Sequence, residues 1–424
     1  MTAAHNSAQA QAISFTAFAV GFFFSFRAVL VMVSARVFGM GTEPGVVAGL
    51  AIEFALMLMI AFQAAGLAPR SLHWFARQST VRWVFLFLAF SCSSLLWSAT
   101  VSRPASFLYW CAMASDVACV VLLLRGEPVN EVAHSLMRGF IWSTCVLASI
   151  AWMMPATNDL RLGDQDYFNT NQIGNLCAMA IFMAQFLTGR KSGRWKLPIF
   201  FLTVTLLRSL SKATIIAFLF AETFLLIYDQ SISRRKKVSL AVGVLLLIAV
   251  FGGLIGTYFD VYTTTGNQAE TLTGRTAIWA YTLGTSLEKP WFGNGIDAMW
   301  KVFPPFGKEM FEARHAENEL LQQFFAYGVA GVIMLAGLYL SLFRKIRSLP
   351  VGLPRAVLLG IMLFIVVRGL AEAEPFDLLL PLWMIALMSS IAEDAQGLHE
   401  AHRSSTVIAS PAVRSVAMPG SSAL

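Results

Sequence analysis

The chain alternates between long apolar runs and short polar connections over most of its length. Runs of about 16 to 22 apolar residues are long enough to cross ~30 Å of hydrocarbon as α-helices. Roughly a dozen such runs follow one another, over 13–34, 45–65, 82–98, 106–124, 139–155, 172–188, 197–211, 213–228, 238–258, 319–343, 353–370 and 375–392. We therefore expect an all-α, polytopic membrane protein with about 12 transmembrane helices.

The composition favours the same class of protein. Hydrophobic residues make up 57% of the chain and charged residues only 13%, whereas a soluble domain carries about 25% charged residues. The cysteines all fall inside apolar runs without metal-ligand spacing, at Cys92, Cys111, Cys119, Cys145 and Cys177. They are expected to be small buried hydrophobic residues rather than disulfides or ligands. The N-terminus lacks a basic segment before its first apolar run, so we expect that run to remain as an anchor.

Arginine and lysine predict the topology. The segments 70–78, 189–196, 229–237 and 344–355 are basic and short, and they occupy every second connection. The positive-inside rule places these segments, and both termini, on the cytoplasmic side of the membrane. The net charge of +7 is explained by these loops, so no nucleic-acid partner is expected.

The same topology divides the chain into three parts. Residues 1–12 form a cytoplasmic N-terminus, and 13–392 form the transmembrane domain with a large periplasmic loop over 259–318 that contains short helices. Residues 393–424 are rich in small residues and carry no apolar period. We expect them to form a disordered cytoplasmic tail.

Ionisable residues within the apolar runs are costly in lipid and should face the bundle interior. Arg27, Glu53, Asp116 and Glu222 are expected to form structural pairs, and Glu372 lies at the edge of a run. Several cations instead lie on the predicted outer face, where positive charge is unusual: Arg161, Arg208, Lys212, Arg275, Arg314 and Arg368. Guanidinium groups bind phosphate bidentately and keep their charge, so we expect about three or four of these residues to form a phosphate site.

The stretch RHAENELLQQFFAYG, from Arg314 to Gly328, brings an imidazole and a carboxylate to the start of an apolar helix. His315 and Glu317 are candidates for a catalytic base. In the alternative interpretation, Glu317 and Glu319 cap the helix and stabilise its dipole. Asn318 and Gln322 are candidates for further substrate contacts. A zinc site is not expected, because the other histidines fall in predicted cytoplasmic segments and the cysteines in apolar runs.

Four stretches together resemble the O-antigen ligase and O-antigen polymerase superfamily of bacterial membrane glycosyltransferases, and most of all its exopolysaccharide polymerases. They are YFNTNQIG (167–174), RSLSKAT (208–214), TLTGRTAIW with EKPWFGNG (271–295) and AENELLQQFFAYGVAG (316–331). Their order and the large loop before the last of them match the family. The resemblance covers roughly residues 80 to 390.

The resemblance implies a metal-independent, inverting sugar transfer at the periplasmic face, without a cofactor. Its donor is a glycan on undecaprenyl pyrophosphate, and a chain-length regulator is a candidate partner. By this resemblance Arg275 is the first candidate for the pyrophosphate contact, followed by Arg208 or Lys212 and by Arg368. In the family pattern a histidine stands eleven residues before a glycine, but the residue eleven positions before Gly328 is Glu317, which Asn318 follows. Glu317 and His315 both remain candidates for the base.

Four functions compete at this stage. A polymerase passes the glycan to another lipid-linked repeat, whereas an O-antigen ligase passes it to a lipid A core sugar. A transporter or flippase for a lipid-linked glycan predicts repeated halves with broken helices, and we find no such repeat in the sequence. A structural scaffold does not explain cations concentrated on one face. We therefore favour the polymerase, in contact with the lipid bilayer and its lipid-linked glycan.

Overall fold

The computed structural model describes residues 2–40, 43–65, 70–154, 162–163, 168–188, 193–228, 233–235, 237–239, 242–243, 245–246, 249, 272–305 and 313–408. The described residues form helices joined by turns, which confirms the all-α prediction. The helices are α1 Thr2–Arg36, α2 Glu43–Ala65, α3 Leu72–Arg77, α4 Ser79–Ser94, α5 Arg103–Gly126, α6 Val129–Met153, α7 Thr170–Thr188, α8 Lys196–Ser209, α9 Lys212–Tyr228, α11 Leu272–Glu288, α12 Met299–Val302, α13 Glu319–Arg347, α14 Leu353–Arg368 and α15 Leu382–Ile408.

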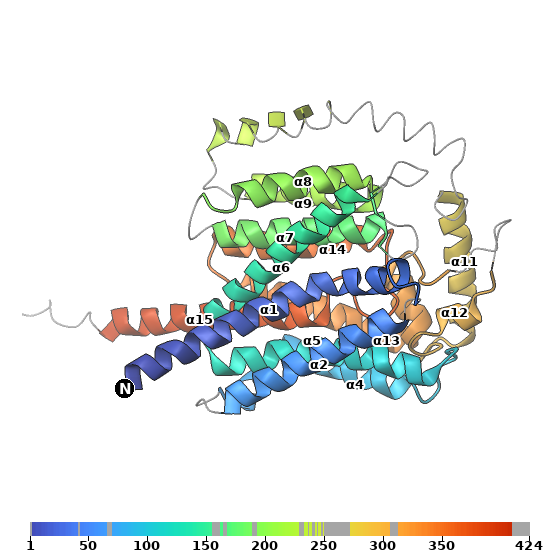
Figure 1. Ribbon diagram of the computed structural model, residues 1–424, viewed down its shortest axis with the longest axis horizontal. Helices are drawn as coiled ribbons and strands as arrows, with labels where there is room; N and C mark the ends of the chain where they lie inside the picture. The colour runs from blue at the N-terminus through green and yellow to red at the C-terminus, as the bar shows by residue number, and fades with distance from the viewer. Residues whose placement is uncertain are drawn as a thin grey trace, which may run out of the picture.

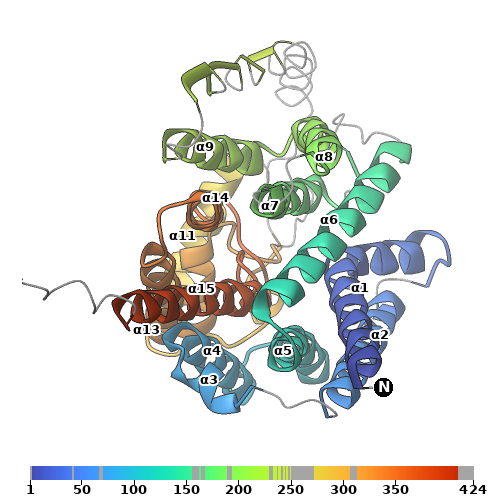
Figure 2. The same cartoon turned by 90° about the vertical axis from the view of Figure 1, so that its left-hand side faces the viewer.

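Most of these helices lie lengthwise in one bundle (Figure 1). Viewed along the bundle, α1 and α2 form one flank, α8 and α9 another, and α5, α7, α14 and α15 lie nearer the centre (Figure 2). Helix α1 packs most extensively on α6. A Cβ at Gly139 of α6 would lie 2.0 Å from the carbonyl oxygen of Phe18, so the backbones meet more closely than any side chain allows. Small residues at helix crossings are typical of membrane proteins.

Five of the described helices are long and apolar enough to cross a membrane. They are Ser14–Arg36, Glu43–Ala64, Arg103–Gly126, Val129–Met153 and Glu319–Arg347. A multi-pass membrane protein is therefore supported. The count of about twelve and the periplasmic position of the large loop remain predictions.

Several helix boundaries differ from the prediction, and those of α6 and α15 have a clear local cause. Helix α6 begins at Val129 rather than near 139, because Pro128 starts a polar but helical first turn. Helix α15 begins at Leu382 rather than at 375, after a segment with prolines at 375 and 381. The carboxylate of Asp377 accepts hydrogen bonds from the backbone N–H groups of Leu378 and Leu382, at 2.7 and 3.4 Å, and so stabilises this irregular segment.

Helix α15 also continues to Ile408 and thus extends into the predicted tail. Helix formers such as alanine, glutamate and glutamine are common just after position 393, which favours continuation of the helix. Residues 409–424 lie outside the described residues.

Helix α11 runs across one end of the bundle, and α12 lies beside it (Figure 1). The start of α1 and the end of α15 lie at the opposite end. The prediction of short helices within 259–318 is consistent with α11 and α12. We call α11, α12 and the turn 289–298 between them the end layer. It carries Arg275 and packs against the segment 313–318, which holds the other candidates of this region.

A break in α13 joins the end layer to the bundle. Gly328 has φ 65° and ψ −155°, so the helix is interrupted there. The backbone N–H groups of Asn294 and Gly295 donate to the carbonyls of Phe325 and Ala326, at 2.9 and 2.8 Å, and Val329 donates to Pro290 at 2.7 Å. The break thus exchanges helical hydrogen bonds for bonds to the turn 290–295.

Gly328→Ala should destabilise the protein strongly. Its φ and ψ are almost restricted to glycine and cost any other residue about 1–3 kcal/mol. A Cβ there would also lie 2.4 Å from the backbone carbon of Trp291. We expect a clearly lower midpoint of thermal unfolding for the detergent-purified protein. The control is Gly284→Ala in α11, where a Cβ meets no heavy atom within 4 Å. Equal midpoints for the two variants would contradict this account of the break.

Candidate functional site

The start of α13 is fixed to the turn that follows α14. Asn318 is the N-cap: its Oδ1 accepts from the Leu321 N–H at 3.0 Å, and its Nδ2 donates to the Leu370 carbonyl at 3.1 Å. The Glu319 N–H donates to the Gly369 carbonyl at 2.9 Å. The cap is therefore Asn318, which satisfies both this helix start and a carbonyl of the neighbouring turn.

Glu319 is structural in this arrangement. Its Oε1 accepts a hydrogen bond from the Tyr339 hydroxyl and another from the Leu379 N–H, each at 2.9 Å. The side chain is buried. Glu319 thus connects α13 to the segment before α15 and leaves Glu317 as the carboxylate that faces the end layer.

Glu317 has an unusual backbone conformation for its residue type. Its φ is +51°, in the left-handed region, which costs a residue other than glycine about 1–2 kcal/mol. The Trp279 Nε1–H of α11 donates to the Glu317 carbonyl at 3.2 Å and helps to hold this conformation. Backbone strain of this kind concentrates at functional sites, so it favours a role for Glu317 beyond capping.

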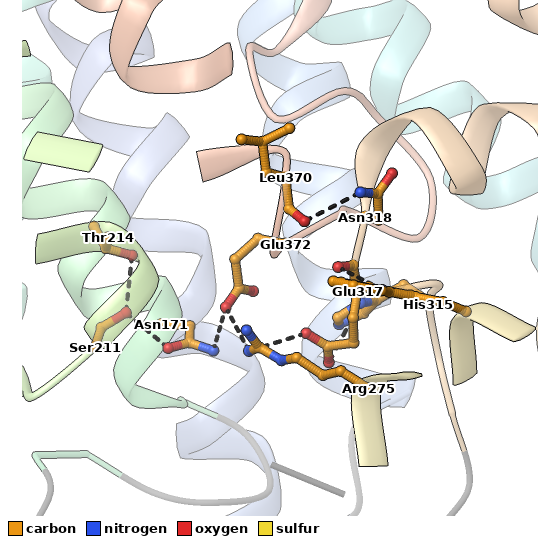
Figure 3. Close-up of polar contacts among 10 residues, drawn as sticks. Asn171, Ser211, Thr214, Arg275, His315, Glu317, Asn318, Leu370 and Glu372 are labelled. Carbon is orange, nitrogen blue, oxygen red and sulfur yellow. Dashed lines mark hydrogen bonds and ion pairs between the residues drawn. The ribbon is translucent and has the colours of Figure 1, made fainter. Parts of the chain in front are cut away.

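Arg275 lies between two carboxylates (Figure 3). Its Nη2 is 3.2 Å from Glu372 Oε1 and 3.3 Å from Glu317 Oε2. His315 Nδ1 lies 3.7 Å from Glu317 Oε1. The structure therefore brings together Arg275, His315 and Glu317, which the sequence analysis selected separately.

Glu372 also binds the helices on the other side of the site. Asn171 Nδ2 donates to Glu372 Oε1 at 2.9 Å, and the Ser211 hydroxyl donates to Asn171 Oδ1 at 2.7 Å (Figure 3). Ser211 forms a further hydroxyl hydrogen bond with Thr214 at 2.8 Å. All four stretches on which the resemblance rests therefore contribute to one hydrogen-bonded cluster around Glu372.

Arg368 is the largest of the fully buried side chains, at 2% exposure. Its Nε and Nη1 atoms are buried without a hydrogen-bond partner among the described residues. Its charge acts on His315, Glu319 and Glu372 and so belongs to the same site. A buried guanidinium with unsatisfied donors is costly unless a ligand pairs with it, and an anion fits those donors.

Burial shifts the pKa values of Glu372 and His315, which both lie in segments between helices. Burial, supported by the charge of Glu317, raises the pKa of Glu372 above its ordinary value, against the opposing charges of Arg368, Arg275 and His315. Burial lowers the pKa of His315, together with Arg368 and Arg275, although Glu372 and Glu374 act in the opposite direction. The His315 imidazole is therefore mainly neutral at neutral pH and able to accept a proton.

The remaining candidates lie in several places. Gln322 Oε1 accepts from the Ala316 N–H at 2.9 Å, so its side chain supports the loop that carries Glu317. Arg208 lies in the last turn of α8 and Lys212 begins α9, so the two cations stand on either side of the short connection between these helices. Arg314 is exposed and stacks on Trp300, with its guanidinium carbon 4.8 Å from the ring centre. Arg161 lies outside the described residues.

The residues of the cluster that were absent from the candidate list include Asn171 and Glu372. Asn171 stood within the YFNTNQIG stretch, and Glu372 was noted only as an ionisable residue at the edge of an apolar run. Only their positions in the sequence could have indicated them. Asn171 is an amide at the start of one apolar run, and Glu372 is a carboxylate four residues after Arg368.

Comparison with known proteins gives one match. The model of a family described as O-antigen ligase matches residues 197–336. This range contains Arg275, His315, Glu317 and Asn318, whereas Asn171, Arg368 and Glu372 lie outside it. No curated protein matches the chain.

Glu372→Gln should lower the pKa of His315 further, because it removes a negative charge that raises this pKa. Diethyl pyrocarbonate modifies the neutral imidazole, and His315 is 25% exposed. The rate of modification of His315, followed by mass spectrometry, falls as the pH drops through its pKa. That fall should occur at a lower pH in Glu372→Gln than in the wild type.

The control is Glu288→Gln, which changes an exposed glutamate at the end of α11. It should leave unchanged the pH at which the modification rate of His315 falls. If the modification rate falls at the same pH as in the wild type, or at a higher pH, the charge of Glu372 does not raise the pKa of His315.

Proposed function

We propose, on the premise that the chain belongs to the O-antigen ligase and polymerase superfamily through residues 197–336, that it polymerises undecaprenyl-pyrophosphate-linked oligosaccharide repeats. The reaction takes place at the periplasmic face of the bacterial inner membrane and builds a surface polysaccharide or exopolysaccharide. The observation that carries this proposal is the cluster of Arg275, Glu317, His315 and buried Arg368.

The two arginines serve the leaving group. Arg275 has a guanidinium held by carboxylates at 3.2 and 3.3 Å, and Arg368 has buried N–H donors without a partner among the described residues. When the bond between the anomeric carbon and the pyrophosphate oxygen breaks, its electron pair goes to that oxygen. Preorganised guanidinium groups stabilise the charge that develops there. The proposed transfer uses these arginines and no metal ion.

Glu317 or His315 serves the attacking group. An acceptor hydroxyl oxygen forms the new bond to the anomeric carbon on the face opposite the leaving group, so the anomeric configuration is inverted. Its proton passes to the base. A carboxylate performs this role in inverting glycoside hydrolysis. We assign Glu317 as the base, because it combines a strained backbone with contact to Arg275. The second candidate for the base is neutral His315, whose Nδ1 lies 3.7 Å from Glu317 Oε1.

The remaining candidates keep secondary roles in this proposal. Arg208, Lys212, Arg161 and Arg314 are candidates to hold the rest of the lipid-linked pyrophosphate, and Asn318 and Gln322 hold the loop of Glu317 in place. Glu372 positions Arg275 and Asn171 relative to each other.

A second candidate function is transfer of the glycan to lipid A core or to another acceptor. The description of the matching family as O-antigen ligase favours it. Both candidates share the donor and the chemistry, and they differ in the acceptor alone.

Deletion of the gene, followed by analysis of the cell's glycans, tests the proposal. Loss of long polymer with single repeats retained supports the polymerase. Long polymer that stays on its lipid carrier supports the ligase. Normal glycans of both kinds would refute both functions.

Arg275→Ala should abolish product in the complemented deletion strain, by at least about 100-fold, because one charge-stabilising donor is typically worth that much. Arg275→Lys should rescue little, since lysine keeps the charge but loses the bidentate geometry. Polymer length and amount on gels provide the measurement. Lys289→Ala, an exposed cation of the same end layer, is the control. Wild-type product from Arg275→Ala would remove the assignment to the pyrophosphate.

Glu317→Gln and His315→Ala, tested separately, identify the base. Loss of a general base costs about 10²- to 10⁴-fold. We expect this loss in Glu317→Gln and a smaller one in His315→Ala, with Glu288→Gln as the control. The yield of polymer per unit of membrane-inserted protein is the measurement. The reverse order would identify His315 as the base, and full activity in both variants would place the base elsewhere.

A further inference from the structure

A second polar region lies inside the bundle, next to the candidate site. It is a cavity of about 370 Å³ between α1, α2, α5, α7 and the segment before α15. Its polar lining includes Arg27, Glu53, Asp116, Asn175, Glu374 and Asp377. The volume lies in the lower part of the ~300–1,000 Å³ range of small-molecule sites. The sequence analysis interpreted Arg27, Glu53 and Asp116 as structural pairs.

The ion pair within the cavity is incomplete. Arg27 Nη1 lies 2.7 Å from Asp116 Oδ2, as that interpretation predicts. The other oxygen of Asp116, the Oε1 of Glu53 and the Oδ1 of Asn175 are buried without a hydrogen-bond partner among the described residues. Glu53 is 2% exposed and Asp116 is 1% exposed. Three buried acceptors around one cavity each lose the stabilisation of a hydrogen bond unless a ligand provides the donors.

The chemistry of this lining favours a ligand with several hydroxyl groups. The unsatisfied atoms are carboxyl and amide oxygens, which pair well with hydroxyl groups. In the described part of the chain no group of three or more His, Cys, Asp or Glu residues is suitably arranged for a metal ion. A sugar offers hydroxyl groups on several sides.

Aromatic and apolar side chains complete the lining. The rings of Tyr109 and Phe376 stack with their centres 4.1 Å apart, and both residues line the cavity. Met113, Leu176 and Met179 also line it. Apolar walls with a few placed polar groups are typical of ligand sites, and a sugar ring presents C–H faces to such walls.

The cavity adjoins the candidate site through two segments. Asn171 of α7 donates to Glu372, and Asn175, one helical turn later, lines the cavity. Glu374, which also lines the cavity, follows Glu372 by two residues. One face of α7 thus extends from the arginine cluster to the unsatisfied acceptors.

We propose that this cavity binds the acceptor sugar, with Glu53, Asp116 and Asn175 accepting hydrogen bonds from its hydroxyl groups. The inference rests on the proposed function, because it names the second substrate of the same reaction. Donor pyrophosphate then occupies the arginine side of the site and the acceptor sugar the carboxylate side.

Saccharide binding to the full-length protein in nanodiscs tests this proposal. The probe is the free oligosaccharide repeat released from the surface polysaccharide of the source organism, titrated under saturation-transfer NMR. Asn175→Leu removes an acceptor at nearly constant volume, and Glu53→Gln replaces one carboxyl oxygen by an amide NH2 group at constant size. Each should weaken binding about 10-fold or more, because a hydrogen bond to a charged or otherwise unsatisfied buried group is worth that much.

Two controls separate the alternatives. The first control is Ser341→Ala in α13. Ser341 follows Glu319 by 22 residues and therefore lies about 30 Å further along the helix. This variant should bind the saccharide as the wild type does. Arg275→Ala should lose transfer but keep saccharide binding, since it acts on the donor. Each variant is compared at an unchanged midpoint of thermal unfolding, and either of the two cavity variants is sufficient if the other does not fold.

The outcomes decide between the two proposals. Wild-type affinity in both cavity variants, or no saccharide binding by an active wild-type protein, overturns the acceptor site and leaves the proposed function intact. Normal glycans in the deletion strain overturn the proposed function instead. In that case the same titration still decides whether the cavity binds a sugar, through the loss of affinity in Asn175→Leu and Glu53→Gln.

Discussion

The candidate site depends on the buried carboxylate of Glu372. One oxygen of this residue accepts from Asn171 of α7 and lies 3.2 Å from Arg275 of α11. It therefore connects a helix of the bundle, the end layer and the segment before α15. A carboxylate removed from water is stable only with charged or hydrogen-bonded partners. Each partner is thereby fixed in place, and Arg275 presents its guanidinium from one defined position.

The cluster nearly balances its own charge. Arg275 and Arg368 supply two positive charges and Glu317 and Glu372 two negative ones, while His315 is mainly neutral. Because the opposite charges compensate each other, four ionisable groups can lie close together in a largely buried site. In the reaction that we propose, the incoming pyrophosphate competes with the carboxylates for the arginines. The raised pKa of Glu372 assists that exchange, because a glutamate that takes up a proton more readily gives up its arginine more readily.

The sequence was sufficient for the helices and for much of the site. Apolar runs located α8, α9 and α13 to within a few residues, because length and hydropathy determine a helix in a bilayer. The irregular segment before α15 was missed, since its apolar composition hides a turn held by Asp377. Composition is the same in a helix and in a packed turn, and only the tertiary contacts distinguish them.

The site shows the same division. Arg275, His315 and Glu317 were selected from local patterns, and the structure brings them together. Glu372 was not selected, because its partners Arg275 and Asn171 lie 97 and 201 residues away along the chain. Local patterns likewise suggested Glu317 and Glu319 as caps, whereas the N-cap is Asn318. That choice depends on Gly369 and Leu370, whose carbonyls accept the bonds of Glu319 and Asn318.

The left-handed backbone at Glu317 has a consequence for the evolution of this protein. Glycine or asparagine accepts such a φ at less cost than glutamate, so a replacement by either would relieve strain. The same replacement would remove the carboxylate next to Arg275. Position 317 is therefore one where the most stable residue and the most useful residue differ. Selection for thermal stability alone would therefore favour a more stable protein that lacks the carboxylate we propose as the base.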